Sequence, residues 1–150
     1  MNSRVLYIDQ DYSLSRAIDA DVKKREQCIV VDMLREKFDI SRGYNLGVHT
    51  IEEASKTFEH VPFQALVTHF PTNAIKLGGA MREVYAQSTQ VIKAIKARMP
   101  ILRVIIYTRE GSLMPSLVKL AGADIFVPKS SNPRADGGHI IQALESMSYF

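Results

Sequence analysis

The sequence predicts an α/β fold in which a doubly wound, five-stranded parallel sheet lies between two layers of helices as a three-layer sandwich. Short apolar runs alternate along the chain with apolar stripes of helical spacing, which is typical of strands joined by helices. Four of the five runs are apolar on successive residues, as strands covered on both faces require. The length of 150 residues and the hydrophobic content of 46% favour a single domain over residues 1–150.

Five runs rich in branched and aromatic residues are the candidate strands. They cover residues 5–8, 46–48, 65–67, 104–107 and 125–127. Helical segments separate consecutive runs, so the connections are expected to be helical crossovers. Strands that are joined by such crossovers run parallel to one another.

Five apolar stripes of helical spacing are the candidate helices. The first is expected to begin after Asp11 as its N-cap and to end before Gly43, with its stripe at Leu14, Ile18, Val22, Ile29 and Met33. A short second helix is expected over residues 51–58. The third is closed by Pro100, the fourth ends before Gly122, and the fifth covers residues 140–147.

Composition restricts the functional classes. Cys28 is the single cysteine, which excludes an intramolecular disulfide and favours a reducing compartment. No apolar run approaches the ~20 residues that span a bilayer, and the first residues lack the pattern of a signal peptide, so a cytoplasmic chain without membrane association is expected. The net charge of +3 comes from basic residues scattered among acids, which does not favour direct nucleic-acid binding.

Polar residues follow four of the predicted strands. In an open parallel sheet the ligand crevice lies outside the carboxyl ends of the strands, so these residues are expected to share one site. The candidate site residues are Asp9, Gln10, Asp11, Thr68, His69, Thr108 and Lys129.

Four segments, taken in order, resemble the receiver domain of two-component response regulators over essentially the whole chain. VLYIDQD resembles the first strand of that family with its acidic pair, and FQALVTHFP resembles the third strand, which ends in the phosphoacceptor aspartate. VIIYTREGS resembles the fourth strand, with Thr108 as the hydroxyl residue that contacts the phosphoryl group. GADIFVPKS resembles the fifth, with Phe126 as the switch aromatic and Lys129 as the family's lysine.

Two departures from that family define what the resemblance implies here. His69 stands where the family has the acceptor aspartate, and an imidazole cannot form an acyl phosphate. Gln10 stands where the second acid of the metal-binding pair belongs, although Mg²⁺ prefers anionic oxygen ligands. The resemblance therefore implies a degenerate receiver, a pseudo-receiver, that lacks aspartyl phosphorylation and needs no metal or other cofactor.

The altered site raises a question of charge. An imidazole and an ammonium group close together disfavour each other's charged forms. We therefore expect Asp9 to pair with Lys129, and a neutral His69 to hydrogen-bond to Thr108 or to water. A partly buried histidine that only caps a strand is the alternative for His69.

The function that the resemblance implies is signalling through protein–protein interaction, not catalysis. The chain would bind a protein partner or an effector domain, either as a free-standing domain or as the N-terminal regulatory domain of a transcription regulator. In receivers a homodimer or effector contact commonly uses the fourth helix, the fifth strand and the fifth helix. The residues expected on this surface are Lys119, Phe126, Ile140 and Leu144.

Two other functions stay open. A phosphoryl group could be accepted by an atypical residue, either His69 or Asp11, since a nucleophilic nitrogen can form phosphohistidine. A small-molecule-binding flavodoxin-like domain is the second, although the D-x-H-x-x-G pattern of the cobalamin-binding members is absent. The sequence also has no G-x-S-x-G pattern, so hydrolase chemistry is not favoured.

Overall fold

The computed structural model describes residues 3–10, 12, 18–44, 63–70, 81–109 and 114–146, and only the backbone of residues 81–84, 114, 115 and 117. Its strands are β1 (Arg4–Asp9), β2 (Asp39–Tyr44), β3 (Ala65–Thr68), β4 (Arg103–Thr108) and β5 (Ile125–Pro128). They form one five-stranded sheet in the order β2-β1-β3-β4-β5, and every neighbouring pair is parallel. The predicted doubly wound parallel sheet is confirmed.

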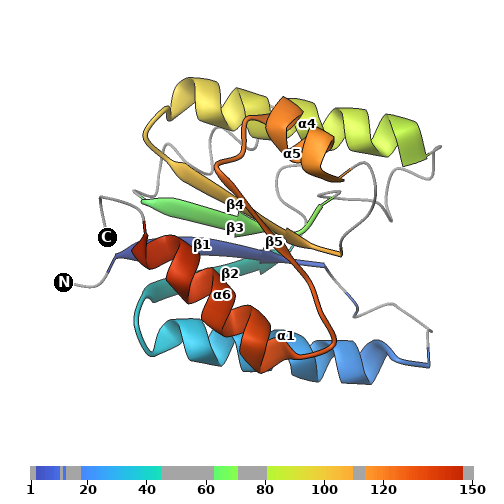
Figure 1. Ribbon diagram of the computed structural model, residues 1–150, viewed down its shortest axis with the longest axis vertical. Helices are drawn as coiled ribbons and strands as arrows, with labels where there is room; N and C mark the ends of the chain where they lie inside the picture. Colours follow the sequence, from blue (N-terminus) through green and yellow to red (C-terminus); the bar gives the residue numbers. More distant parts are fainter. Residues whose placement is uncertain are drawn as a thin grey trace.

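Helices cover both faces of this sheet, so the molecule has three layers (Figure 1). The described helices are α1 (Ala20–Arg35), α4 (Met81–Arg98), α5 (Met114–Ala121) and α6 (Pro133–Glu145). Helices α1 and α6 pack side by side on one face, and α4 and α5 lie on the other. None of the described helices is long and apolar enough to cross a membrane.

Two hydrophobic layers result from the alternation of side chains along each strand. Val5 and Tyr7 of β1 pack with Val30 and Leu34 of α1 in the layer under α1 and α6. Leu6 and Ile8, which alternate with them along β1, point the other way, toward the layer under α4 and α5. Because both faces of the central strands are buried, successive residues of β1, β3 and β4 are apolar.

The ends of two helices follow from local chemistry. Helix α6 begins after Asn132, whose side chain accepts a hydrogen bond from the backbone N–H of Ala135, and Pro133 occupies the first helical position. Helix α5 is followed by Gly122 at φ 78°, a left-handed conformation that glycine adopts without a steric penalty. The predicted stop of this helix at Gly122 is confirmed.

The first helix departs from the prediction in its start and in its buried face. It begins at Ala20 instead of directly after Asp11, which lies outside the described residues. Ile18 is fully exposed, at 104%, and Val22 is 44% exposed. The buried stripe runs through Gln27, Val30, Val31 and Leu34, a spacing of three and four residues that lies about one residue out of phase with the predicted stripe.

The second strand also differs from the prediction. It covers Asp39–Tyr44, across the point before Gly43 where the first helix was expected to end. Gly43, expected to follow that helix, lies in β2 opposite Ile8. The strand has no apolar run because each of its residues is exposed or only half-buried. The predicted strand at 46–48 and helix at 51–58 lie outside the described residues.

Candidate functional site

The predicted site residues that the structure describes lie at the carboxyl ends of four strands. Asp9 ends β1 and Gln10 follows it, and Thr68 ends β3 and His69 follows it. Thr108 ends β4, and Lys129 follows β5. Since the strands are parallel, these ends meet at one edge of the sheet. Asp11 lies outside the described residues.

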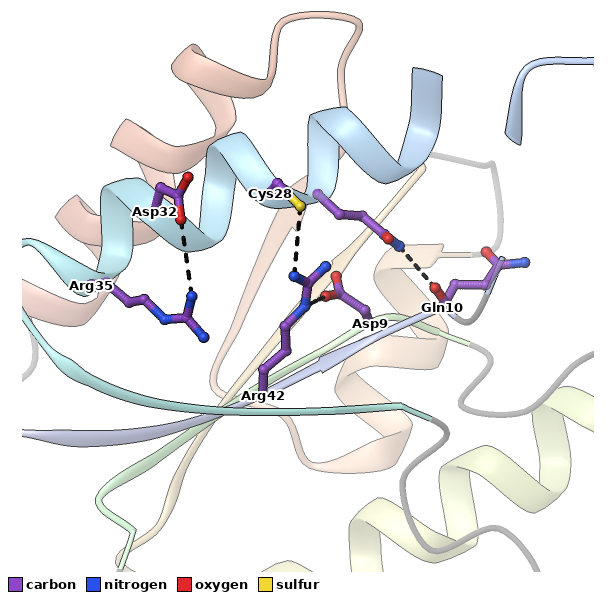
Figure 2. A network of polar contacts seen from close by, with 7 residues as sticks. Asp9, Gln10, Cys28, Asp32, Arg35 and Arg42 are labelled. Carbon is purple, nitrogen blue, oxygen red and sulfur yellow. Dashed lines mark hydrogen bonds and ion pairs between the residues drawn. The ribbon is translucent and has the colours of Figure 1, made fainter. Parts of the chain in front are cut away.

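An ion pair between Asp9 and Arg42 is the main polar contact at this edge. Nε of Arg42, on the neighbouring strand β2, lies 2.5 Å from Oδ2 of Asp9. Figure 2 shows the guanidinium group between Asp9 and Cys28, whose Sγ lies 3.8 Å from Nη1 of Arg42. The predicted pairing of Asp9 with Lys129 was therefore wrong, because β2 supplies a cation directly beside the end of β1.

The electrostatics of Asp9 are set mainly by burial. Only 4% of the residue is exposed, and burial raises the pKa of its carboxyl group to about 6. Arg42 and Lys129 act in the opposite direction, as does the hydroxyl of Tyr7 on the same face of β1. Asp9 therefore sits beside two cations and still ionises less readily than an exposed aspartate.

The two cations respond to the same surroundings. Burial lowers the pKa of Lys129, and the Asp9 carboxylate partly offsets that shift. Burial would also lower the pKa of Arg42, yet the Asp9 carboxylate holds that pKa above its ordinary value. The Arg42 guanidinium is thus a permanent positive charge at the position where it neutralises Asp9.

The hydroxyl groups at the edge are bonded to the backbone. Oγ1 of Thr108 donates to the carbonyl oxygen of Phe70 at 2.9 Å, and Oγ1 of Thr68 donates to that of His69 at 3.0 Å. His69 is half-buried, and its backbone N–H donates to the carbonyl oxygen of Ile8. The Thr108 hydroxyl thus donates to the loop after β3 instead of to the His69 side chain.

Gln10 contacts groups above the end of β1. Its side-chain oxygen accepts a hydrogen bond from the hydroxyl of Tyr12 at 3.1 Å, and its carbonyl oxygen accepts one from Nε2 of the buried Gln27 at 2.8 Å. The backbone carbonyl of Gln10 therefore links the end of β1 to helix α1. The side-chain amide carries no charge that could attract a divalent cation.

The described residues at this edge do not fit the Mg²⁺ site that the resemblance to receivers would imply. A guanidinium group pairs with Asp9, and the residue beside Asp9 is an amide. Mg²⁺ binds through oxygen ligands, preferably carboxylates, and a neighbouring fixed cation repels it. Within the described parts of the chain, no group of three or more histidine, cysteine, aspartate or glutamate side chains is placed to hold a metal ion.

The predicted interaction surface needs correction at two positions. Ile140 and Leu144 are 0% exposed and pack into the layer under α1 and α6, so they cannot contact a partner. Phe126 is partly buried against the opposite layer. Lys119 on α5 is exposed as predicted. Helical periodicity placed Ile140 and Leu144 on an apolar stripe, and the fold turns that stripe toward the sheet.

Sequence reasoning missed three residues that shape the site: Arg42, Tyr107 and Asp136. Arg42 escaped because its segment was not recognised as a strand. Tyr107 ends an apolar run and was therefore interpreted only as a core residue. Its ring also contacts Lys129, whose Nζ lies 5.4 Å from the ring centre. Asp136 lies in the first turn of α6 and is buried. It was missed because an acid in that position is usually interpreted as an exposed residue that stabilises the helix N-terminus.

The comparisons with known proteins agree with this architecture. No protein-family model matches the sequence, and a search of curated proteins finds no match. Solved structures of similar fold include the chemotaxis response regulator CheY4 of Vibrio cholerae, with 14% sequence identity and a TM-score of 0.62 over 96% of this chain and 99% of that chain. A CheY-like protein of Pseudomonas aeruginosa, TadZ, has 13% identity and a TM-score of 0.63 over 94% and 98% of the two chains.

A third similar structure is a CheY-like response-regulator receiver domain from Methanospirillum hungatei. It has 20% identity and a TM-score of 0.58, over 97% of this chain and 95% of that chain. Likenesses at these identities establish the fold. The chain therefore has the fold of CheY-like receiver domains, a five-stranded parallel sheet between two layers of helices.

Proposed function

We propose that this chain is a receiver-like signalling domain that binds a protein partner or effector domain without aspartyl phosphorylation. The observation that carries the proposal is the contact between Arg42 and Asp9 at the carboxyl edge of the sheet. In the receivers that the sequence resembles, the acids after the first strand bind a divalent cation that assists phosphoryl transfer. Here a guanidinium group neutralises the acid instead.

Two further features support the same function. His69 follows β3 at the position of the acceptor aspartate, and an imidazole cannot form an acyl phosphate. The raised pKa of Asp9 means that its environment disfavours the charge that a metal ligand needs. Phosphoryl transfer depends mainly on charge neutralisation by metal ions and fixed cations, so their arrangement decides whether it can proceed.

A partner surface is proposed at α5, β5 and α6, with the buried Ile140 and Leu144 excluded from it. On α5, Lys119 is exposed, and the neighbouring apolar residue Leu120 is 57% exposed. A homodimer or an effector contact through this face would cover that side chain. The proposal involves no catalytic activity and places the chain in the cytoplasm, where receiver-type signalling takes place.

The test is a titration of the whole chain with beryllofluoride and Mg²⁺, followed by amide NMR. Beryllofluoride mimics an aspartyl phosphate only where the acceptor and the metal site are intact, so no shift is expected at Asp9, Thr108 or Lys129. A receiver domain with an acceptor aspartate is the positive control. Saturable shifts at these three residues would show that the edge still binds a phosphoryl group and would overturn the proposal.

A parallel measurement addresses the atypical acceptors. The chain is incubated with acetyl phosphate, and its intact mass is measured before and after treatment with acid. We expect no added phosphoryl group. An acid-labile addition that disappears in His69→Ala would assign phosphoryl transfer to the histidine instead.

A further inference from the structure

A buried carboxylate in helix α6 bonds to Ser130, the residue that follows Lys129. Asp136 is 1% exposed, and its carboxylate accepts three hydrogen bonds. The donors are the hydroxyl of Tyr107 at 2.7 Å, the backbone N–H of Ser130 at 3.0 Å and the hydroxyl of Ser130 at 2.6 Å. A buried carboxylate is tolerated only when such donors bond to it. Because Asp136 belongs to α6, the three bonds hold this helix to Tyr107 and Ser130.

The two donor residues, Tyr107 and Ser130, are neighbours of Lys129. The ring of Tyr107, one donor residue, lies beneath the Lys129 ammonium group, with Nζ 5.4 Å from the ring centre. Ser130, the other donor residue, directly follows Lys129 in the chain. The backbone N–H of Lys129 itself donates to the carbonyl oxygen of Thr108 at 2.7 Å. Asp136 is therefore bonded to Tyr107, whose ring faces the ammonium group, and to Ser130, the next residue along the backbone from Lys129.

The same bonds continue into the first turn of α6. The hydroxyl of Ser130 accepts a hydrogen bond from the backbone N–H of Asn132 at 3.0 Å. The side chain of Asn132 caps the helix by accepting from the backbone N–H of Ala135 at 3.2 Å. A displacement of Ser130 or Tyr107 would thus change contacts at the start of the helix.

At its other end the network reaches the carboxyl edge of the sheet. Asp9 and Lys129 attract each other electrostatically. Tyr7 and Tyr107 lie in the hydrophobic layer under α1 and α6, and Asp9, two residues after Tyr7, points to that same face. Other charged groups around Lys129 are Glu26, Lys23 and Arg109.

We propose that Asp136 is the positioning residue of Lys129, and that the Asp136 clasp, made of Tyr107, Ser130 and Asp136, transmits changes at Asp9 and Lys129 to the start of helix α6. The inference goes beyond the proposed function, because it holds whether or not the edge accepts a phosphoryl group. It assigns the first turn of α6 as the segment that responds to a change at the carboxyl ends of the strands. The alternative is that Asp136 only stabilises the helix.

The first experiment uses a substitution at the edge as the perturbation and NMR of the full chain as the readout. Asp9→Asn changes the charge beside Lys129, and we expect amide shifts at Ser130, Ala135 and Asp136. In a Tyr107→Phe background, which removes one bond of the clasp, these shifts should fall by at least half. Tyr7→Phe is the matched control: its hydroxyl lies beside Asp9 and takes no part in the clasp.

Two results would overturn the inference. One is the absence of shifts at Ser130, Ala135 and Asp136 when Asp9→Asn is introduced into the wild-type chain. The other is a set of shifts that is equally large in the Tyr107→Phe background. Because Tyr107→Phe keeps the aromatic ring in the core, it tests the bond without emptying the site.

The second experiment measures the titration of Lys129 by NMR of its side-chain nitrogen in Asp136→Asn. Burial lowers the pKa of Lys129 in the wild type, so loss of positioning should let the ammonium group move toward water and raise that pKa toward its ordinary value. Asp136→Glu, which keeps the carboxylate, should restore part of the effect. A helix-stabilising role alone would lower the unfolding midpoint and leave the titration of Lys129 unchanged, and Tyr107→Phe gives the same measurement if Asp136→Asn does not fold.

Discussion

Asp9 is a buried acid whose charge the fold disfavours, so its protonation is expected to influence stability. Burial raises its pKa to about 6 from an ordinary 3.8. Between these two pH values the folded chain keeps a proton that the unfolded chain has lost. The contribution of Asp9 to stability is therefore greatest below about pH 4 and falls as the pH rises through about 6.

We accordingly expect Asp9→Asn to be more stable than the wild type near pH 7 and equal to it near pH 4. A shift of about two pKa units corresponds to at most about 3 kcal/mol, and the amide oxygen can still accept a hydrogen bond from Arg42. Urea denaturation at both pH values measures the difference in free energy of unfolding.

The control for this prediction is Asp39→Asn, which removes an exposed carboxylate paired with Arg4 on the neighbouring strand. Exposed ion pairs contribute little, so its effect should stay within about 1 kcal/mol at either pH. A wild type that is more stable than Asp9→Asn near pH 7 would show that the Arg42 ion pair outweighs the burial of Asp9.

At the scale of the elements, the contact between α1 and α6 depends on a glycine. A Cβ atom on Gly137 would lie 2.6 Å from Sδ of Met33 on α1, whereas a Cβ on the next residue, Gly138, would meet nothing within 4 Å. The two glycines therefore share the helix and differ in what faces them. Gly137 lets the two helices approach each other closely.

This difference predicts that one substitution has different effects at the two adjacent positions. Gly138→Ala should raise the free energy of unfolding by roughly 0.5–1 kcal/mol, because alanine favours the helix. Gly137→Ala should be at least about 1 kcal/mol less stable than Gly138→Ala, since Met33 must move. Thermal or urea denaturation of both variants decides it, and equal stabilities would mean that Met33 yields without cost.

At the same scale, four strands agreed with the sequence and one did not. The central strands β1, β3 and β4 are buried on both faces, so each appears in the sequence as a continuous apolar run. Strand β2 lies at one edge of the sheet, and each of its residues is exposed or half-buried. What makes it a strand is hydrogen bonding to β1, which leaves no hydrophobic pattern. The other edge strand, β5, keeps an apolar run and was predicted, so such patterns miss an edge strand only where exposure removes that run.

For the whole molecule, the sheet separates two hydrophobic layers that should act independently. Ile105 and Ile106 are adjacent in β4 and both 0% exposed, yet Ile105 packs under α1 and α6 and Ile106 under α4 and α5. Their side chains share no layer. Substitutions at the two positions are therefore expected to be additive in free energy.

We expect Ile105→Val and Ile106→Val each to lower the free energy of unfolding by about 0.5–1.5 kcal/mol, and the double variant by their sum to within about 0.5 kcal/mol. Ile101→Val is the control, because Ile101 is 78% exposed and should tolerate the change. Urea denaturation of the wild type, the two single variants and the double variant provides the cycle. A coupling well above that margin would indicate that the two layers are not energetically separate.

Some residues of the candidate site could be predicted from the sequence pattern, and others could not. Asp9, His69, Thr108 and Lys129 were identified from sequence because each follows an apolar run, and parallel strands carry such positions to one edge. Which cation pairs with Asp9 was decided by the register of β1 and β2, which brings Arg42 alongside. Asp136 could not be identified in this way, since its partners lie 6 and 29 positions away along the chain.

The sequence by itself determined the alternation of strands and helices, the parallel sheet, and the set of polar residues at its carboxyl edge. These follow from local periodicity and from burial, which leave a direct trace in the order of apolar residues. Only the tertiary structure decided the edge strand β2, the pairing of Asp9 with Arg42, and the orientation of Ile140 and Leu144 toward the core. These depend on contacts between distant segments, and the distances and burial that fix them exist only once the chain has folded.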